Sequence, residues 1–116
     1  MARVRALRVV LAAASLLALA PGCSEGPKPL EIAEDRIIVR NLTGEDWTGV
    51  EVRVNQYYLA TAPRLAAGGQ LDAPLRRFQG GFGYYFDPRR EALRLVEVSA
   101  RTAGGAPVRL GWRRGG

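Results

Sequence analysis

The stretch RIIVRNLTGEDWTGVEVRVN, residues 36–55, decides the fold. It holds a β-branched run at 37–39, a polar, glycine-containing segment at 41–46 and then, over 50–55, valines that alternate with charged or polar residues. A period of two places the valines on one face and the polar side chains on the other, as in a strand that is half buried. The stretch therefore predicts two β-strands joined by a turn.

The same alternation recurs along the rest of the chain, where glycine-rich or proline-containing turns separate the runs. The further strand candidates are residues 57–61, 71–76, 82–86, 91–102 and 108–112. Residues 63–69 are expected to form a loop, and Asp87-Pro88 is expected to open at most a single helical turn. The change of parity between Leu93 and Val96 indicates either a bulge near Leu95 or a stretch buried on both faces. We expect no long helix after Cys23. Six or seven short strands in about ninety residues predict an antiparallel sandwich, with a small barrel as the alternative.

Several residues within this pattern carry a resemblance. Asn41, the run from Trp47 to Asn55, Leu71, Phe78 and the Phe86-Asp87-Pro88 step together resemble small immunoglobulin-like domains of bacterial envelope proteins. The resemblance implies an immunoglobulin-like sandwich, which is a fold rather than an activity. The expected core is Trp47, Ile38, Val50, Val52, Val54, Tyr58, Leu71, Phe82, Tyr84, Val96 and Val98.

The composition is that of a globular protein and not of a strongly basic one. The 116 residues are 47 % hydrophobic and 24 % charged, with a formal charge of +6. Three of the 17 cations, Arg3, Arg5 and Arg8, precede Cys23, so the rest of the chain holds 14 cations against 11 anions, a charge of +3. This modest charge does not favour a nucleic-acid partner.

The N-terminus has the pattern of a secretory signal peptide. Its arginines are followed by the uncharged run Val9–Ala20, which at 12 residues is shorter than the roughly 20 needed to cross a bilayer as a helix. We therefore expect residues 1–22 to form a cleaved signal helix. The alternatives are an N-terminal membrane anchor and a buried helix.

The end of this leader, Leu19-Ala20-Pro21-Gly22-Cys23, resembles the signal of bacterial lipoproteins. Leu19 lies one position earlier than in most members of that class. The resemblance implies that Cys23 receives a diacylglycerol thioether and becomes the acylated N-terminus after cleavage. Acylation would also consume a thiol that has no second cysteine to pair with in an oxidising compartment.

The expected organisation has four parts. After the signal peptide, residues 23–30 comprise the lipidated cysteine and a proline-containing tether, which favours an extended backbone. Residues 31–112 form the sandwich domain, and residues 113–116 are expected to be frayed.

The chain lacks the residues that most catalytic mechanisms use. There is no histidine, and the one cysteine belongs to the leader junction, so imidazole bases, Ser-His-Asp arrangements and thiolate or imidazole metal sites are excluded. A carboxylate pair could serve a glycosidase, and Asn41, Thr43, Glu45 and Asp46 could offer oxygens to calcium. We expect instead that the carboxylates belong to turns and solvated strand faces, and we expect neither an enzyme nor a cofactor.

One segment suggests a ligand. Residues 76–90 place two arginine pairs around an aromatic, glycine-rich run, and such side chains can stack on sugars and bind anionic groups. The candidate ligand-binding residues are Arg76, Arg77, Phe82, Tyr84, Tyr85, Arg89 and Arg90. The competing interpretation buries Phe82, Tyr84 and Phe86 on the inner face of a strand and leaves the arginines as solubilising ends.

Two functional hypotheses follow from these observations. The first is a non-enzymatic lipoprotein of the bacterial cell envelope, held on a membrane by its lipid, facing the periplasm or the exterior and acting as a binding or structural accessory. The second is a soluble secreted or periplasmic domain that binds an anionic glycan through the arginine and aromatic residues. Expected partners are the membrane, an envelope protein or an anionic glycan, and not nucleic acid.

Overall fold

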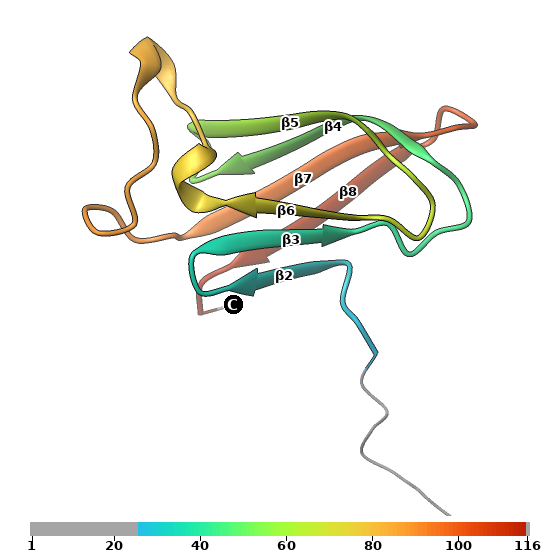
Figure 1. Ribbon diagram of the computed structural model, residues 1–116, viewed down its shortest axis with the longest axis horizontal. Helices are drawn as coiled ribbons and strands as arrows, with labels where there is room; N and C mark the ends of the chain where they lie inside the picture. Colours follow the sequence, from blue (N-terminus) through green and yellow to red (C-terminus); the bar gives the residue numbers. More distant parts are fainter. Residues whose placement is uncertain (1–25, 116) are drawn as a thin grey trace, which may run out of the picture.

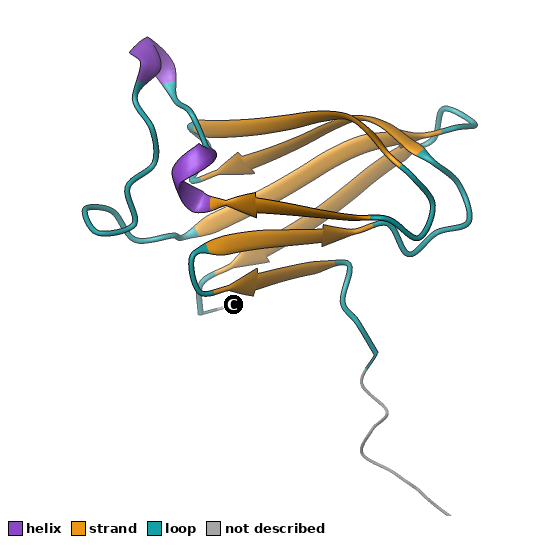
Figure 2. Cartoon of the chain, viewed as in Figure 1, coloured by secondary structure: helices purple, strands orange, loops and turns teal. Residues whose placement is uncertain are grey.

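A computed structural model of the protein describes residues 26–115. The predicted signal peptide, residues 1–22, and Cys23 lie outside the described residues. The strands within the described residues are β2 (Leu30–Ala33), β3 (Arg36–Arg40), β4 (Trp47–Val54), β5 (Tyr58–Leu65), β6 (Gln70–Pro74), β7 (Leu95–Thr102) and β8 (Pro107–Arg113). They form two antiparallel sheets, one in the order β2-β3-β6 and the other in the order β5-β4-β7-β8 (Figures 1 and 2). The predicted all-β antiparallel sandwich is confirmed.

Strand β4 has the predicted alternation, with one bulge whose position was not predicted from the sequence. Val50, Val52 and Val54 are buried, as is Trp47, which lies three residues before Val50 and would point outward in a regular strand. A register shift after Thr48 supplies the extra residue, and Gly49 adopts a φ of 58°. The bulge therefore lies in β4. Of the two alternatives near Leu95, the bulge was wrong, because Leu95 is the first residue of β7.

In β3, the inward residues are Ile37 and Val39, which face the other sheet and are fully buried. Ile38 is also buried, at 9 % exposed, but it lies on the outer face of this sheet, where it pairs with Glu31 and Asp72, and so it packs outside the core between the two sheets. A run of three β-branched residues does not indicate which alternate side chains face the core. The packing of β3 against its partner strands and the other sheet determines this.

The core between the sheets differs from the expected one at its aromatic residues. Phe78 and Phe86 are buried, whereas Phe82 and Tyr84 are exposed. The segment expected as a strand at 82–86 is not one, because Gly81–Gly83 form a 3-10 turn. Leu65, Leu75 and Leu93 complete the buried core together with the β4 and β7 valines.

Turns and 3-10 segments make up the remaining connections. β5 continues to Leu65, so the loop expected at 63–69 begins only at residue 66. A 3-10 turn, Leu75–Arg77, follows β6. The Glu91 N–H donates to the Asp87 carbonyl at 3.0 Å, which is the single helical turn expected there. No helix within residues 26–115 is long and apolar enough to cross a membrane.

Candidate functional site

The most unusual feature is a short projection between β6 and β7, residues 79–85, which we call the aromatic loop. Its base is fixed to β5 by two backbone hydrogen bonds between Leu59 and Gln79, of 3.0 and 3.1 Å. Gly80 N–H donates to the Tyr84 carbonyl at 2.7 Å and closes the tip. The loop projects from the upper left of the sandwich in Figure 1, where it is coloured yellow to orange. These bonds give it one defined conformation.

The aromatic loop places large apolar side chains in water. Phe82 is 97 % exposed, Tyr84 67 % and Tyr85 58 %, and Tyr57 on the adjacent β4–β5 turn is 50 % exposed. The interpretation that buried Phe82 and Tyr84 in a strand was therefore wrong. Clustered exposed aromatic residues are more informative than isolated ones, because soluble proteins seldom leave such a patch uncovered without a use for it.

The tip of the aromatic loop also holds backbone strain. Phe82 adopts φ 57° and ψ 21°, the left-handed region, which costs a bulky residue more than it costs glycine. Gly83 beside it has a φ of 78°, which glycine adopts freely. Strained residues of this kind cluster at ligand-binding sites. A buried contact does not explain the strain at Phe82, since its side chain is exposed.

The Tyr57 ring packs against the aromatic loop at Gly80, where the lack of a side chain leaves room for it. A Cβ built on Gly80 would lie 2.3 Å from Cε2 of Tyr57 and 2.7 Å from its Cδ2. The Tyr57 ring in turn meets Tyr58 edge-on, with 5.0 Å between ring centroids, and Tyr58 meets Phe86 in the same way at 5.2 Å. The exposed aromatic patch thus rests on the buried core.

We predict that Gly80→Ala displaces the Tyr57 ring from the aromatic loop and lowers the free energy of unfolding by about 1–2 kcal/mol, since the ring must move to admit the methyl group. Urea unfolding and the chemical shifts of the Tyr57 ring measure these effects. Gly44→Ala is the matched control, because nothing lies within 4 Å of a Cβ at Gly44. Tyr57 shifts that are unchanged in Gly80→Ala would contradict the packing described.

A small polar network supports the aromatic stack. The Tyr58 hydroxyl donates to Glu91 Oε1 at 2.8 Å, and the Asn55 amide donates to Glu91 Oε2 at 3.2 Å. The hydrogen bond to Glu91, followed by burial, raises the pKa of Tyr58 above its ordinary value of 10.0. Tyr58 therefore stays neutral and keeps this contact throughout the physiological range.

The four candidate arginines divide into two kinds. Arg76 and Arg89 each lie 3.6 Å from Asp87 Oδ1. The Arg89 backbone N–H, aided by the charges of Arg89 and Arg76, holds the pKa of Asp87 below its ordinary range. Arg77 and Arg90 are exposed and, among the described residues, have no carboxylate within ion-pair distance. These two cations, which flank the aromatic loop in the sequence, therefore remain available to an external anion.

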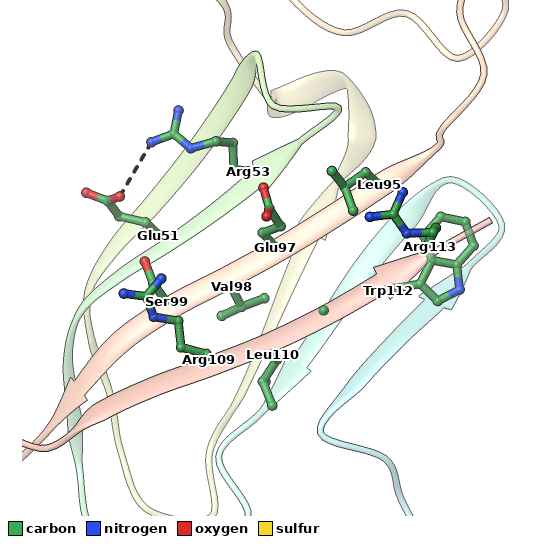
Figure 3. A pocket seen from close by; sticks show the side chains of 11 residues that line it. Glu51, Arg53, Leu95, Glu97, Val98, Ser99, Arg109, Leu110, Trp112 and Arg113 are labelled. Atoms are coloured by element: carbon green, nitrogen blue, oxygen red, sulfur yellow. Dashed lines mark ion pairs between the residues drawn. The ribbon is translucent and has the colours of Figure 1, made fainter. Parts of the chain in front are cut away.

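A shallow cleft of about 850 Å³ lies elsewhere, on the outer face of β4, β7 and β8 (Figure 3). Glu51 and Glu97 are diagonal neighbours there, because Glu51 pairs with Ser99 while Glu97 pairs with Arg53. Glu51 also lies 3.6 Å from Arg53. Both glutamates are exposed, whereas a glycosidase needs one carboxyl kept protonated, usually by burial. This arrangement favours a solvated strand face over a hydrolytic pair.

The oxygens considered for calcium have partners within the loops. The Asp46 carboxylate accepts hydrogen bonds from Arg64 and from the Ala67 N–H, and these bonds, the one from Arg64 first, hold its pKa below its ordinary value. Glu45 Oε1 accepts a hydrogen bond from Gly104 N–H at 3.2 Å. Within residues 26–115, no three His, Cys, Asp or Glu side chains are grouped as metal ligands would be. These carboxylates fasten loops to one another.

Comparison of the chain with known protein families, curated proteins and solved structures finds no match. The candidate site therefore rests on its own geometry. The segment proposed from the sequence, residues 76–90, contains the aromatic loop but not Tyr57, which the structure places beside it. The signal that could have found it is the Tyr57-Tyr58 pair directly after a turn, because adjacent strand residues point to opposite faces and one of two tyrosines must then face solvent.

Proposed function

We propose that the protein is a non-enzymatic lipoprotein of the bacterial cell envelope, whose sandwich domain binds a ligand through the aromatic loop. The observation that carries this proposal is the placement of the exposed aromatic residues at the end of the sandwich remote from the N-terminal tether. A domain tethered at one end and equipped with a binding surface at the other can reach a partner away from its membrane.

The strand register defines these two ends. β2 begins at Leu30, which pairs with Val39 near the end of β3, and β4 starts beside this end after the 41–46 loop. β4 then runs the length of the sandwich to the turn at Asn55–Tyr57, against which the aromatic loop packs. In Figure 1 β2 begins at the right-hand end of the sandwich, and the aromatic loop stands at the upper left.

The tether would set the distance from the membrane. Six residues separate Cys23 from Leu30, and they span at most about 20 Å when fully extended. Two or three acyl chains on Cys23 would make attachment effectively permanent, since each buried methylene contributes about 0.8 kcal/mol. The aromatic loop would then face away from the anchoring surface.

The side chains of the site favour an anionic glycan as the ligand. Exposed tyrosine and phenylalanine rings offer flat apolar surfaces on which sugar rings stack, and Arg77 and Arg90 offer guanidinium groups for carboxylate or sulfate. This ligand class also fits the second candidate function, a soluble secreted or periplasmic glycan-binding domain. The two candidates differ in anchoring and share the same site.

We predict that changing Arg77 and Arg90 together to Gln abolishes salt-sensitive retention on an immobilised anionic polysaccharide such as heparin, because ionic attraction supplies the salt-sensitive part of the affinity. Phe82→Ser should weaken retention at constant charge. The unfolding free energy of both variants should remain within about 0.5 kcal/mol of the parent protein, since all three side chains are exposed.

Two matched variants separate this site from general basicity. Arg64 and Arg101 changed together to Gln remove the same charge from β5 and β7, near the tethered end, and should leave retention nearly unchanged. Asp87→Asn keeps an oxygen for the Arg89 N–H and releases Arg76 and Arg89, so it should strengthen retention. Equal loss in the two double variants would show that net charge, and not the aromatic loop, accounts for binding.

A further inference from the structure

Strand β8 forms an open edge of the larger sheet. The hydrogen bonds from Thr102 N–H to Ala106 and from Arg114 N–H to Arg94 set which residues of the β7–β8 ladder are bonded pairs. Hydrogen-bonded and non-bonded pairs alternate along an antiparallel ladder, so the residues of β8 that bond β7 are Val108, Leu110 and Trp112. The backbone groups that point away from β7 belong to Arg109, Gly111 and Arg113. Within residues 26–115 no strand pairs with that side of β8. Three alternate residues of β8 therefore offer N–H and C=O groups to an added strand.

The other edges of the two sheets are largely closed to such pairing. In β5, Leu59 already bonds Gln79 and Pro63 has no N–H, which leaves Thr61. β6 ends in Pro74, which also lacks a donor. β2 is four residues long and has only two edge-facing residues. β8 is thus the longest edge free of proline in its interior and of a capping segment.

Gly111, at the centre of this edge, has no explanation in the fold. A Cβ built there would meet only the Val96 carbonyl oxygen, at an ordinary 3.8 Å, and its φ is not in the left-handed region. Glycine in a strand lowers stability, and it commonly marks a place where another backbone comes close. Gly111 also lines the shallow cleft on the outer face of this sheet, so the surface above it is open.

The side chains that flank the edge define what could pair with it. Partly buried apolar residues face the seam between the two sheets: Val108, Leu110, Trp112, Leu30 and Ile32. On the outer face, Arg109 and Arg113 are exposed and have no carboxylate within ion-pair distance among the described residues. Gly111 lies between them, opposite Glu97.

We propose that the β8 edge binds an extended peptide as an additional strand, with apolar residues at alternate positions and an acidic residue opposite each of Arg109 and Arg113. Backbone hydrogen bonds would supply affinity and the alternate side chains would supply specificity. The residue opposite Gly111 would be uncharged or cationic, because Glu97 lies behind it. The sequence pattern that fits is Glu-Val-Gln-Val-Glu.

A second copy of this chain fits the same edge poorly in the register centred on Gly111. Antiparallel pairing of two β8 strands about Gly111 would place Arg109 of each copy opposite Arg113 of the other. Like charges directly opposite one another destabilise a strand pair. The occupant inferred here is therefore a different, acidic polypeptide segment.

The test uses the intact protein in mild detergent and a peptide of about eight residues built around Glu-Val-Gln-Val-Glu. We expect the peptide to bind and to slow amide hydrogen exchange at Arg109, Gly111 and Arg113. A Lys-Val-Gln-Val-Lys peptide and a scrambled Glu-Glu-Gln-Val-Val peptide should not bind. No binding of the first peptide, or protection that maps to the aromatic loop, would overturn the proposal.

Two variants make the test specific. Gly111→Pro removes one edge donor and should weaken binding about tenfold or more, whereas Thr61→Pro, the matched change on β5, should have no effect. Should Gly111→Pro fail to fold, Arg109→Glu with Arg113→Glu keeps every backbone donor and should reverse the preference towards the lysine peptide. If the glutamate variant still prefers the same peptide, the arginines do not select the ligand. If the parent protein binds neither peptide and the variants self-associate, the arginines serve only to prevent β8 from pairing with other strands.

Discussion

Replacing Asn41 with alanine is expected to lower the free energy of unfolding by about 2–4 kcal/mol, the largest stability loss predicted for a single polar residue of this domain. Asn41 is fully buried. Its side-chain amide donates to the Glu45 carbonyl at 2.7 Å and to the Leu65 carbonyl at 3.0 Å, while its Oδ1 accepts from the Thr43 N–H at 3.0 Å. Removal of the side chain leaves the buried Leu65 carbonyl without this donor and takes one partner each from the part-buried Glu45 carbonyl and Thr43 N–H.

The effect of Asn41 reaches beyond its own turn. Its backbone N–H donates to the Gly69 carbonyl, and its carbonyl accepts from the Gly68 N–H. One residue thus joins the β3–β4 loop to the β5–β6 loop across the two sheets. The chain has a single cysteine and hence no internal disulfide, so such a connection has no covalent substitute.

Urea unfolding followed by tryptophan fluorescence measures this effect, because Trp47 is buried nearby in β4 and Trp112 is partly buried in β8. Thr43→Ala is the matched control, since it removes one exposed partner of Asn41 and should cost no more than about 1 kcal/mol. A loss below about 1 kcal/mol in Asn41→Ala would contradict the role assigned to this network.

The second large effect concerns location. We expect Cys23→Ser to move the protein from the membrane fraction to the water-soluble fraction almost completely, because no acyl chain could then be attached. Fractionation of cells and the mass of the mature N-terminus are the measurements. Ser24→Ala, which leaves the thiol in place, is the control and should remain in the membrane fraction.

Other outcomes of the Cys23→Ser experiment decide between the candidate functions. Retention in the membrane fraction with an unchanged mature mass would contradict lipid anchoring. An unmodified cysteine in the mature parent protein would favour the soluble glycan-binding alternative. Neither outcome bears on the aromatic loop, which the polysaccharide experiment tests separately.

Much of the fold could be predicted from local patterns. The alternation of Val50, Val52 and Val54 requires one buried face, and the glycines between runs require turns. The position of the bulge could not be predicted from β4 alone, because Trp47 and Val50 face the same way only after Gly49 takes a left-handed conformation. The role of Asn41 was also hidden, since an Asn-Leu-Thr-Gly run reads as an exposed turn.

The aromatic loop shows where alternation misleads. Phe82, Tyr84 and Phe86 repeat with a period of two, yet only Phe86 is buried. The 3-10 turn at Gly81–Gly83 ends strand pairing before Phe82 can enter a sheet. The prediction that this segment offers aromatic residues to a ligand named side chains that are exposed in the structure. The division of the four arginines by Asp87 could be seen only in the folded chain.

The most direct test of the central claim is an NMR titration of the intact ¹⁵N-labelled protein with heparin fragments in mild detergent. We expect the shift changes to concentrate at Tyr57, Phe82, Tyr84 and Tyr85 and at the side chains of Arg77 and Arg90, with little change in β2 or the 41–46 loop. Changes spread over every exposed arginine, or centred on the tethered end of the sandwich, would contradict the claim.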